Sequence, residues 1–322
     1  MIRSTRKFPS LPYFWSLIDW SIPSLNPYKG QLLQAQSVDD LASIARKRTP
    51  KVVFDYVEGG AIDEIAYSRS RAAYSRIEIN SRVLRDVSKI DTSEKILGKV
   101  VDIPICFAPT GYTRLMHHVG EPAVANVASN KNLIYALSTM GTTSPEELAA
   151  AVPNSRRWFQ LYIMKNRSDR LAVIKQAKDN GFEALVLTVD TPVVGLRYRD
   201  NRNGLTVPPK IRINTVFAIA RKPIWWLNLF TTGKLEFAAF RGWDKPLSEL
   251  AGLIFDPATT MRDITWLRSV WKGPIIIKGI QSVEDAKAAA KLGVVYLINF
   301  NIPKKPLTFI PVIEIYIMQY LI

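Results

Sequence analysis

The sequence predicts an α/β fold, a (β/α)8 barrel reduced to about six strands, and three observations support it. Short apolar runs recur, and several end in polar residues, as residues 158–162, 184–190 and 274–279 do. Helical segments lie between these runs at intervals of about 20–30 residues. Polar residues at successive strand ends favour a barrel, because barrel enzymes build their active sites there.

Six strands and five helices are expected from residue 103 onward. The strands lack polar alternation, as in a parallel sheet that is buried on both faces. Ser168 and Ser282 can cap helix N-termini, while Gly181 and Gly293 stand where helices end. The expected strands are residues 103–108, 133–138, 158–162, 184–190, 275–278 and 294–300, and the expected helices are residues 121–131, 145–151, 169–180, 261–271 and 283–292.

A doubly wound sheet is the alternative to a barrel, since both folds alternate strands with helices. No G-x-G-x-x-G motif follows the first strand, which argues against a dinucleotide-binding sheet. A helical pair is expected before the strands. Ser37 and Asp40 form a capping-box pattern, Pro50 opens a second helix, and Gly59-Gly60 ends it.

The 322 residues, 48% of them hydrophobic, suffice for one large domain or two small ones. We expect an N-terminal arm (residues 1–36), the incomplete barrel (residues 37–293) and a divergent hydrophobic tail (residues 294–322). The single cysteine, Cys106, lies in an apolar run. We therefore expect a buried thiol and no disulfide framework.

The net charge of +15 permits attraction to anionic lipid, nucleic acid or anionic substrates. Lysine and arginine are spread along the chain and no nucleic-acid motif is visible, so we expect no nucleic-acid partner. No apolar run of about eighteen residues indicates a transmembrane helix, and residues 1–30 lack the pattern of a signal peptide. We expect a cytoplasmic protein, with peripheral contact at the inner face of the membrane as the alternative.

A long segment separates the fourth and fifth expected strands. An insertion after a barrel strand lies on the active-site face, so we expect residues 200–256 to form a lid. Within it, Trp225-Trp226 follows Arg221 and Lys222. This pattern fits either packing on the barrel rim or contact with a membrane surface.

Five residues are candidates for chemistry. Lys278, at a strand end, fits a Schiff-base lysine, a phosphate ligand or a partner for an electron-rich ring, and Asp190 could orient a histidine. Tyr56, Tyr162 and Arg197 could bind a carboxylate. Polar residues at strand ends also solvate loops, so none of the five decides the function alone.

Taken together with their neighbours, these residues form motifs that are specific in combination. The motifs are residues 54–64 (FDYVEGGAIDE), 108–111 (APTG) with 120–121 (GE), 137–139 (LST), 159–162 (FQLY), 187–192 (LTVDTP), 255–257 (FDP) and 277–279 (IKG). From about residue 37 to residue 293, the chain resembles the FMN-dependent α-hydroxy acid dehydrogenase and oxidase family. This family includes L-lactate dehydrogenase, glycolate oxidase and mandelate dehydrogenase.

The resemblance implies an FMN cofactor at the strand ends. The implied ligands are Ala108, Pro109, Thr110, Gly111, Ser138, Gln160, Thr188 and Lys278. The first four form a loop whose backbone lies near the reactive edge of the flavin, and the next three hydrogen-bond the isoalloxazine ring. The lysine stabilises the negative charge of the reduced ring.

The resemblance also implies a substrate site. Tyr56 and Arg197 would hold the substrate carboxylate, Tyr162 would contact the substrate near its hydroxyl group, and Asp190 would pair with a catalytic histidine. The implied partners are a small 2-hydroxy acid and an electron acceptor, which is a quinone, a cytochrome or oxygen. No metal is implied, and full-length relatives are expected to be homo-oligomers.

The catalytic histidine of the resemblance has no counterpart in this sequence. The family carries it in a Ser-Asn-His-Gly-Gly-Arg stretch after the sixth strand, where residues 294–301 here read VVYLINFN. The arginine of that stretch and strands seven and eight, which hold the FMN phosphate, have no counterpart either. The only two histidines, His117 and His118, follow the first strand, where a structural role is expected rather than that of a displaced base.

The tail, residues 294–322, is rich in isoleucine, tyrosine, phenylalanine, asparagine and lysine. This bias suggests a frameshifted or truncated gene, and an evolved hydrophobic C-terminus is the alternative. We therefore expect a flavin-dependent oxidoreductase of L-2-hydroxy acids, such as L-lactate, with impaired activity. A catalytically inactive flavin-binding remnant or a basic membrane-associated fragment is the competing hypothesis, and bound yellow flavin or lactate-dependent dye reduction would distinguish them.

Overall fold

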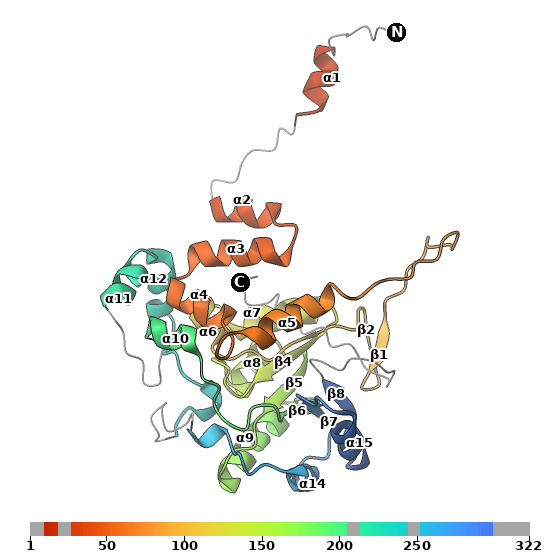
Figure 1. The fold of residues 1–322 in the computed structure, drawn as a ribbon, viewed down its shortest axis with the longest axis vertical. Coiled ribbons are helices and arrows are strands. Elements are labelled where there is room, and N and C mark those ends of the chain that lie inside the picture. Colours follow the sequence, from red (N-terminus) through yellow and green to blue (C-terminus); the bar gives the residue numbers. More distant parts are fainter. Residues whose placement is uncertain (1–9, 19–26, 205–212, 244–251, 299–322) are drawn as a thin grey trace.

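The computed structural model describes residues 10–18, 27–204, 213–243 and 252–298. Its centre is a six-stranded parallel sheet in the order β3-β4-β5-β6-β7-β8 (Figure 1). Every neighbouring pair of strands is parallel. The strands are β3 (Cys106–Phe107), β4 (Ile134–Ser138), β5 (Arg156–Leu161), β6 (Ala184–Thr188), β7 (Ile275–Lys278) and β8 (Tyr296–Ile298). The prediction of an α/β fold with an incomplete parallel barrel is confirmed.

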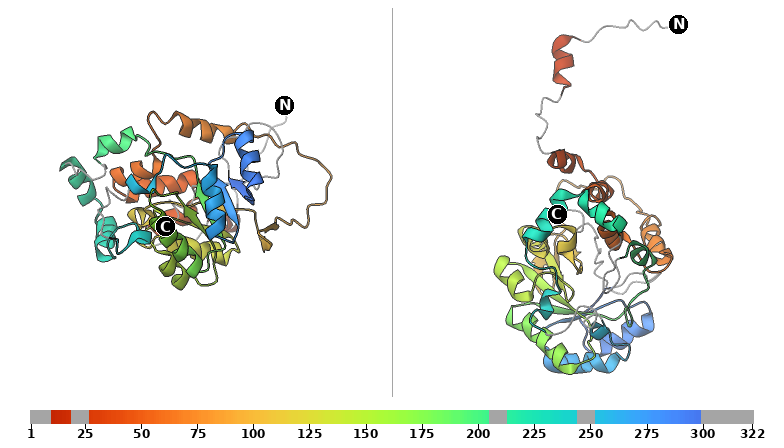
Figure 2. Two further views of the ribbon diagram at one scale, coloured as in Figure 1. Left: turned by 90° about the horizontal axis from the view of Figure 1, so that it is seen from below. Right: turned by 90° about the vertical axis from the view of Figure 1, so that its left-hand side faces the viewer.

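Five helices return the chain from one strand to the next along the outside of the sheet. They are α7 (Glu121–Asn130), α8 (Pro145–Ala151), α9 (Arg167–Asp179), α14 (Met261–Val270) and α15 (Val283–Lys291). Figure 2 shows the later of these helices, in green and blue, curving around the strands. All five fall within two residues of the predicted bounds, because a capping residue or a glycine marks most of the ends.

One predicted cap is wrong. The N-cap of α9 is Asn166 and not Ser168, which lies inside the first turn of the helix. Asparagine and serine are comparable N-cap residues, so the sequence pattern left two candidate starts. Ser282, in contrast, accepts a hydrogen bond from the Asp285 backbone N–H at 3.0 Å, as predicted.

Side chains alternate between the two faces of each strand and build two cores. On β5, Trp158 belongs to an inner core with Ile134, Ala136, Val186 and Ile276. The alternate residues on the same strands point outward and pack against the helices, and they include Tyr135, Leu137, Phe159, Leu185 and Ile277. Residues two positions apart on a strand face the same side. The polar residues at the strand ends, two positions after Ala136, Trp158 and Val186, therefore also face the inside of the barrel.

A two-stranded antiparallel hairpin covers the inner core. It consists of β1 (Glu94–Ile96) and β2 (Lys99–Val101), and its Ile96 and Val101 are buried in the inner core. Leu97 and Gly98 both have positive φ angles, 51° and 78°, as a tight hairpin turn of the primed type requires. Sequence reasoning missed this hairpin, because strands of three residues carry too little periodicity to be recognised.

The N-terminal part of the chain is helical. Its helices are α1 (Leu11–Ser16), α2 (Pro27–Gln34), α3 (Val38–Arg48), α4 (Lys51–Glu58) and α5 (Ile65–Tyr74), and a short α6 (Thr113–Met116) follows β3. The capping box of Ser37 and Asp40 is present as predicted. Pro50 precedes α4 and Gly59 ends it. The core between α3, α4 and α6 includes Phe54 and Met116.

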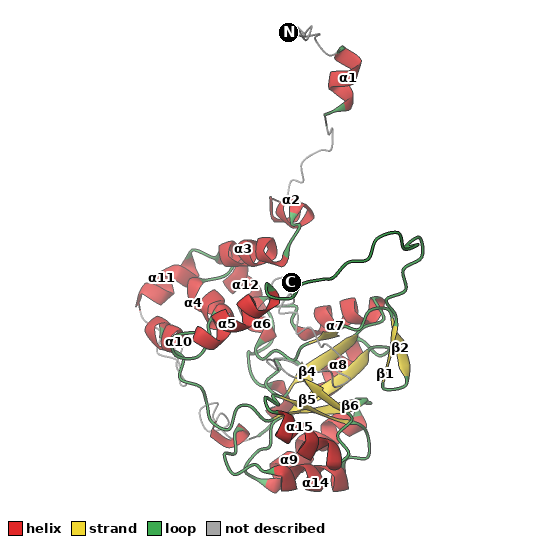
Figure 3. Cartoon of the chain, turned by 45° about the vertical axis from the view of Figure 1, so that its right-hand side comes forward, coloured by secondary structure: helices red, strands yellow, loops and turns green. Residues whose placement is uncertain are grey.

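The segment between β6 and β7 is partly helical. It contains α10 (Tyr198–Asn203), α11 (Ile213–Ala220), α12 (Pro223–Thr231) and a 3-10 turn, η1 (Ala238–Phe240). Figure 3 shows α10, α11 and α12 grouped with α3 and α4 at one end of the molecule. Trp225 packs on the rim, where its Nε1 donates to the Leu115 carbonyl at 2.9 Å. Residues 205–212 and 244–251 of the predicted lid lie outside the described residues.

Among the described residues, no helix is long and apolar enough to span a membrane. Cys106 is a buried thiol, as predicted. Of the predicted tail, only residues 294–298 belong to the described part of the chain, and β8 pairs with β7 there. The remaining tail, residues 299–322, lies outside it.

Candidate active site

A chain of hydrogen bonds joins the ends of three neighbouring strands. The Ser138 hydroxyl donates to Gln160 Oε1 at 3.1 Å, and Gln160 Nε2 donates to Thr188 Oγ1 at 2.9 Å. All three side chains are buried, and Gln160 is 2% exposed. They follow Ile134, Ala136, Trp158 and Val186 on the inner face, so strand parity directs them into the barrel.

Lys278 and Asp190 continue this row at the next strand. Lys278 pairs with Thr188 in the register of β6 and β7, and its Nζ lies 3.9 Å from Asp190 Oδ2. Gly279 follows with a φ of +107°, and a Cβ there would lie 2.5 Å from Asp190 Cβ. Glycine therefore allows the aspartate to approach the lysine strand.

The loop after β3 lies against the loop after β4. The Tyr112 N–H donates to the Met140 carbonyl at 3.1 Å, and a Cβ on Gly111 would lie 3.2 Å from Met140 Cβ. Thr110 Oγ1 lies 3.1 Å from Thr113 Oγ1 at the start of α6. Ala108, Pro109, Thr110 and Gly111 therefore reach the same end of the sheet as Ser138.

Tyr56 and Arg197 are in contact although 140 positions separate them in sequence. The guanidinium lies 5.1 Å from the centre of the Tyr56 ring. It also donates to the backbone carbonyls of Tyr56 and of Gly59, and its Nε lies 2.7 Å from Asp200 Oδ2. Burial raises the pKa of the Tyr56 hydroxyl, and the charge of Arg197 partly offsets this effect.

Asp200 balances the charge of Arg197 in this group. Burial raises the pKa of its carboxyl to about 6, against the opposing effect of the guanidinium. Arg197 is thus already held by two carbonyls and one carboxylate. A substrate carboxylate would have to share this guanidinium with Asp200, which sequence reasoning did not anticipate.

Tyr162 directly follows the end of β5. Burial raises the pKa of its hydroxyl to about 12, and the charges of Asp190 and Tyr56 add to this effect. Its ring contacts Phe255 edge to face, with centroids 5.0 Å apart. The charges of Asp190 and Tyr56 thus both act on Tyr162, and Tyr56 in turn contacts Arg197.

One carboxylate oxygen of Asp190 is left without a partner within the described part of the chain. Its Oδ1 is buried and has no hydrogen-bond partner among the described residues. A buried acceptor without a donor costs about 1–3 kcal/mol, as does the Trp158 Nε1 donor of the inner core, which has no partner among those residues either. Asp190 Oδ1 is where a donor such as a histidine N–H would be expected to bind.

Sequence reasoning missed three residues that support this site. Tyr112, directly after the Ala108–Gly111 loop, is coupled to Tyr56, and burial raises its pKa to about 12. Glu121 is fully buried and accepts hydrogen bonds from Thr142 Oγ1 at 2.7 Å and Thr143 Oγ1 at 2.9 Å. The third is Asp200. The Gly120-Glu121 motif was visible in the sequence, but the hydrogen-bond partners of Glu121, Thr142 and Thr143, are not its neighbours in the sequence.

His117 and His118 lie in another part of the molecule. Their rings stack with centroids 4.5 Å apart, and they line a pocket with residues of α3 and α12. That lining contains none of the predicted FMN or substrate residues. The structure therefore does not bring either histidine to Asp190 Oδ1.

The strand-end residues suit the ring of a flavin. Ser138, Gln160 and Thr188 offer hydroxyl and amide groups that both donate and accept, and Lys278 adds a cation at the end of the row. A flavin ring alternates carbonyl oxygens and ring nitrogens along one edge, which these groups can match. The residues present therefore fit the group that the resemblance implies.

Known proteins resemble this chain over most of its length. Residues 45–298 match the model of the FMN-dependent dehydrogenase family. A candidate L-lactate dehydrogenase of Mycobacterium tuberculosis is 38% identical over 289 residues, which are 90% of this chain and 70% of that protein. A peroxisomal (S)-2-hydroxy-acid oxidase of Oryza sativa subsp. japonica is 36% identical over 275 residues, which are 85% of this chain and 70% of that protein.

Solved structures give the same result. The crystal structure of the monotopic membrane protein (S)-mandelate dehydrogenase superposes with a TM-score of 0.78 at 29% identity, covering 82% of this chain and 71% of that one. A mandelate oxidase variant with (S)-mandelic acid superposes with a TM-score of 0.67 at 31% identity, covering 82% of this chain and 67% of that one. A related mandelate oxidase structure contains an FMN adduct. On fold, sequence and strand-end residues together, this chain belongs to the FMN-dependent dehydrogenase family of flavin oxidoreductases.

Proposed function

We propose that this chain binds FMN at the strand ends and an L-2-hydroxy acid beside it, and that it oxidises the acid only negligibly. The row of Ser138, Gln160, Thr188 and Lys278 on the inner face supports the cofactor site. Both histidines line a different pocket, away from Asp190, and this observation supports the low activity. Bound FMN would accept the electrons that oxidation of the hydroxyl carbon releases.

The residues of the chain would bind and orient the substrate. The substrate carboxylate would lie near Tyr56 and the Arg197 guanidinium, in competition with Asp200. Tyr162, whose pKa is affected by both Tyr56 and Asp190, would contact the hydroxyl group. Abstraction of a proton needs a base, and loss of a general base costs 10²–10⁴-fold in rate as an order of magnitude.

Flavin binding tests the cofactor site. FMN fluorescence would be titrated with the chain, with Lys278→Met as the variant and Lys272→Met as the control. Lys272 is exposed and lies just before β7. We expect roughly ten-fold weaker binding for the first variant, from the loss of one charge-assisted contact, and unchanged binding for the second. Equal affinities for all three proteins would reject the site.

Dye reduction tests the low activity. The chain with saturating FMN would be mixed with L-lactate or glycolate and a redox dye. We expect no turnover above background, because neither histidine lies at Asp190. Steady turnover on the order of 1–10³ per second, as in ordinary enzymes, would reject the proposal of an inactive site and leave the flavin site intact.

A flavin-binding remnant without substrate binding is the second candidate, and the ion pair of Arg197 with Asp200 favours it, because Asp200 competes with a substrate carboxylate. The two candidates differ in substrate binding. L-lactate or its 2-oxo product would perturb the absorbance of bound FMN if the Tyr56–Arg197 group still holds a carboxylate. An unchanged flavin spectrum at saturating acid would favour the remnant.

Peripheral contact with the membrane is supported by α11 and α12. Both helices lack acidic residues in their first turns and are strongly apolar, and Phe217 and Phe230 are 60% and 74% exposed. Arg221 and Lys222 lie between the two helices. Apolar side chains flanked by cations suit an anionic bilayer surface.

Vesicle co-sedimentation tests this contact. Vesicles that contain phosphatidylglycerol should retain the chain, and Phe217→Ser with Phe230→Ser should release most of it. Val193→Ser with Val194→Ser is the control, since both valines are exposed but lie outside α11 and α12. Equal retention of both double variants would reject this surface.

A further inference from the structure

Three cationic and three carboxylate side chains meet around the contact of α4 with α10. Ion pairs connect them, and we call them the α4–α10 charge cluster: Lys51, Asp55, Glu64, Arg197, Arg199 and Asp200. The formal charges of these six side chains cancel. A substrate carboxylate bound to Arg197 would therefore leave the cluster with one unbalanced negative charge, unless a proton came with it.

Asp200 is the most deeply buried carboxylate of the cluster. Its side chain is 7% exposed, against 12% for Asp55 and 19% for Glu64. Its Oδ1 has no hydrogen-bond partner among the described residues. Burial without a donor penalises the ionised form of a carboxylate. Asp200 is therefore the member of the cluster that takes up a proton most easily.

The other two carboxylates of the cluster have donors that favour their charged forms. Asp55 Oδ2 accepts a hydrogen bond from Asn203 Nδ2 at 2.8 Å. Glu64 Oε1 accepts one from the Gly60 backbone N–H at 3.2 Å. Hydrogen bonds to an ionised carboxylate stabilise its charge. An incoming proton would therefore go to Asp200 rather than to Asp55 or Glu64.

The pair of Arg197 and Asp200 is close, but it is not a hydrogen bond. Nε lies 2.7 Å from Oδ2, yet the N–H of this Nε has no acceptor in the described part of the chain. The attraction is therefore one of charge, and it persists only while Asp200 is ionised. A proton on Asp200 would leave the guanidinium its full positive charge, with 32% of the side chain exposed to an incoming carboxylate.

The charge of Asp200 also acts on Tyr56, the other residue expected to hold the substrate carboxylate. Burial raises the pKa of the Tyr56 hydroxyl, Arg197 lowers it, and Asp200 raises it further. An ionised Asp200 thus opposes negative charge at both expected ligands of the substrate carboxylate. Its protonation would favour an anion at both.

The surroundings of Asp200 set the pH at which its charge changes. Burial raises the pKa of its carboxyl to about 6. The charges of Arg197 and Arg199 oppose this rise, and those of Asp55 and Glu64 add to it. Asp200 therefore gains or loses its charge between mildly acidic and neutral pH.

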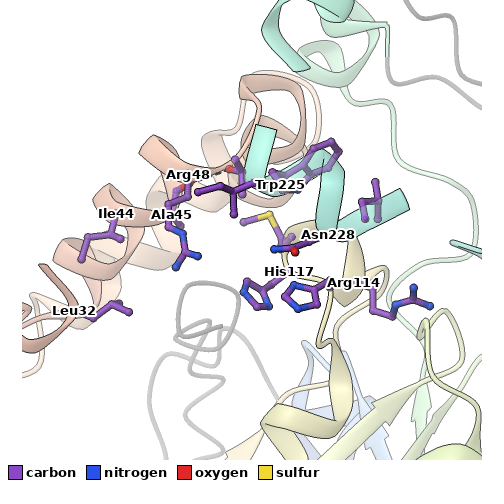
Figure 4. Close-up of a pocket in the computed structure, with 13 residues that line it drawn as sticks. Leu32, Ile44, Ala45, Arg48, Arg114, His117, Trp225 and Asn228 are labelled. Carbon is purple, nitrogen blue, oxygen red and sulfur yellow. Dashed lines mark hydrogen bonds between the residues drawn. The ribbon is translucent and has the colours of Figure 1, made fainter. Parts of the chain in front are cut away.

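Histidine is the usual group that titrates in this pH range, and both histidines of the chain lie elsewhere. Figure 4 shows the pocket of His117, with Arg48 of α3 and Trp225 of α12. The lining of this pocket also includes His118, but it contains no member of the α4–α10 charge cluster. A change of ligand affinity near pH 6 would therefore point to Asp200 rather than to a histidine.

We propose that a 2-hydroxy acid binds to Arg197 together with a proton, which Asp200 takes up. Asp200 would thus decide at which pH the substrate site accepts a carboxylate. This proposal rests on the proposed function for the place of the substrate carboxylate. It concerns ligand binding and neither flavin binding nor turnover, so the two proposals can fail separately.

Equilibrium dialysis with ¹⁴C-labelled L-lactate measures this affinity directly. The full chain would be dialysed with saturating FMN and without an electron acceptor, at pH 5, 6, 7 and 8 and constant ionic strength. L-lactate stays a carboxylate throughout, since carboxylic acids ionise at about pH 4. We expect its dissociation constant to rise roughly 100-fold from pH 5 to pH 8, because only the protonated fraction of Asp200 permits binding.

Asp200→Asn keeps the shape of the side chain and removes its charge. At pH 8 this variant should bind L-lactate as tightly as the parent does at pH 5, within about two-fold, and its affinity should not depend on pH. Asp179→Asn is the control, because Asp179 is exposed on α9 and lies outside the cluster. It changes the net charge equally and should keep the pH profile of the parent.

Two outcomes would overturn this proposal alone. They are equal affinity of the parent for L-lactate at pH 5 and pH 8, and the same pH profile in Asp200→Asn as in the parent. Absence of binding by both proteins at every pH would overturn the proposal together with the proposed substrate site. Failure of FMN to bind, measured by its own fluorescence, would count only against the strand-end site.

Proton uptake by the parent chain decides the proposal if Asp200→Asn fails to fold. L-lactate would be added to the parent in weakly buffered solution at pH 7. We expect uptake of about one proton for each L-lactate bound, because Asp200 is mostly ionised at this pH before the ligand binds. Binding without a change of pH would overturn the proposal.

Discussion

The strand-end site and the pocket that His117 lines between α3, α6 and α12 are both built from residues far apart in the sequence, yet they differ in what fixes their side chains. At the strand ends, each residue continues the inner face of a strand, above a core that contains Trp158 and Ile276. In the pocket, three helical segments meet through a small core and individual contacts, such as Trp225 Nε1 to the Leu115 carbonyl. The pairing register of the strands therefore positions the residues of the strand-end site, whereas contacts between separate helices position those of the pocket.

The largest expected difference between the two regions is their response to loss of a tryptophan. Trp158→Ala should cost about 3–5 kcal/mol in the free energy of unfolding, because Trp158 is 2% exposed in the inner core. Trp225→Ala should cost about 1–2 kcal/mol, because Trp225 is only partly buried. Urea denaturation of both variants measures the two costs. Similar costs would mean that the helices are docked as firmly as the sheet.

A smaller effect is expected from breaking the strand-end hydrogen bonds. Gln160→Leu leaves the Ser138 and Thr188 hydroxyls without their partner in a buried place. We expect a loss of about 2–3 kcal/mol in unfolding free energy together with weaker FMN binding. Gln34→Leu on the exposed face of α2 is the control and should stay within about 0.5 kcal/mol of the parent. If Gln160→Leu left the unfolding free energy unchanged, the hydrogen bonds among Ser138, Gln160 and Thr188 would not form a stabilising buried network.

The smallest effect concerns the pH dependence of the helical pocket. His117 has a pKa of about 4 when folded, below the ordinary value of 6.5. The unfolded chain therefore takes up the proton first as the pH falls. The neutral His117 ring therefore makes its full contribution to the free energy of unfolding above pH 6.5, and this contribution is lost as the pH falls from 6.5 to 4.

His117→Asn should reduce this loss while keeping an acceptor for the Val119 N–H. The difference in Tm between parent and variant, measured from pH 7.5 to pH 4.5, should change by a few degrees across that window. Carboxylate titrations affect both proteins and cancel in the difference. A difference that is constant with pH would contradict the burial of His117.

Much of the sheet could be predicted because its signals are local. The strands are short apolar runs, and helices such as α8 and α15 begin at Ser144 and Ser282 with their own capping bonds. The start of α9 was misplaced because Asn166 and Ser168 are equally good caps. The β1–β2 hairpin was missed because three residues do not establish a period.

The strand-end residues could be named from the sequence for a physical reason. Ser138, Gln160, Thr188 and Lys278 each end an apolar run, and parallel strands bring their carboxyl ends to one edge. Their hydrogen-bond order, however, depends on the stagger between strands, since Gln160 pairs in register with Val186 but bonds Thr188. No local pattern encodes that stagger.

By itself, the sequence determined the strands, most helix ends, the buried thiol and the residues that face the inner barrel, since each depends on neighbours within a few positions. Only the tertiary structure decided that Arg197 donates to the carbonyls of Tyr56 and Gly59, that Asp190 Oδ1 has no donor among the described residues, and that α3, α6 and α12 enclose a pocket. These features arise where segments more than 60 residues apart meet, as Thr49, Arg114 and Asn228 do, or where burial removes water from a polar atom. Side-chain packing and exclusion of water are properties of the folded chain, and no short stretch of sequence carries them.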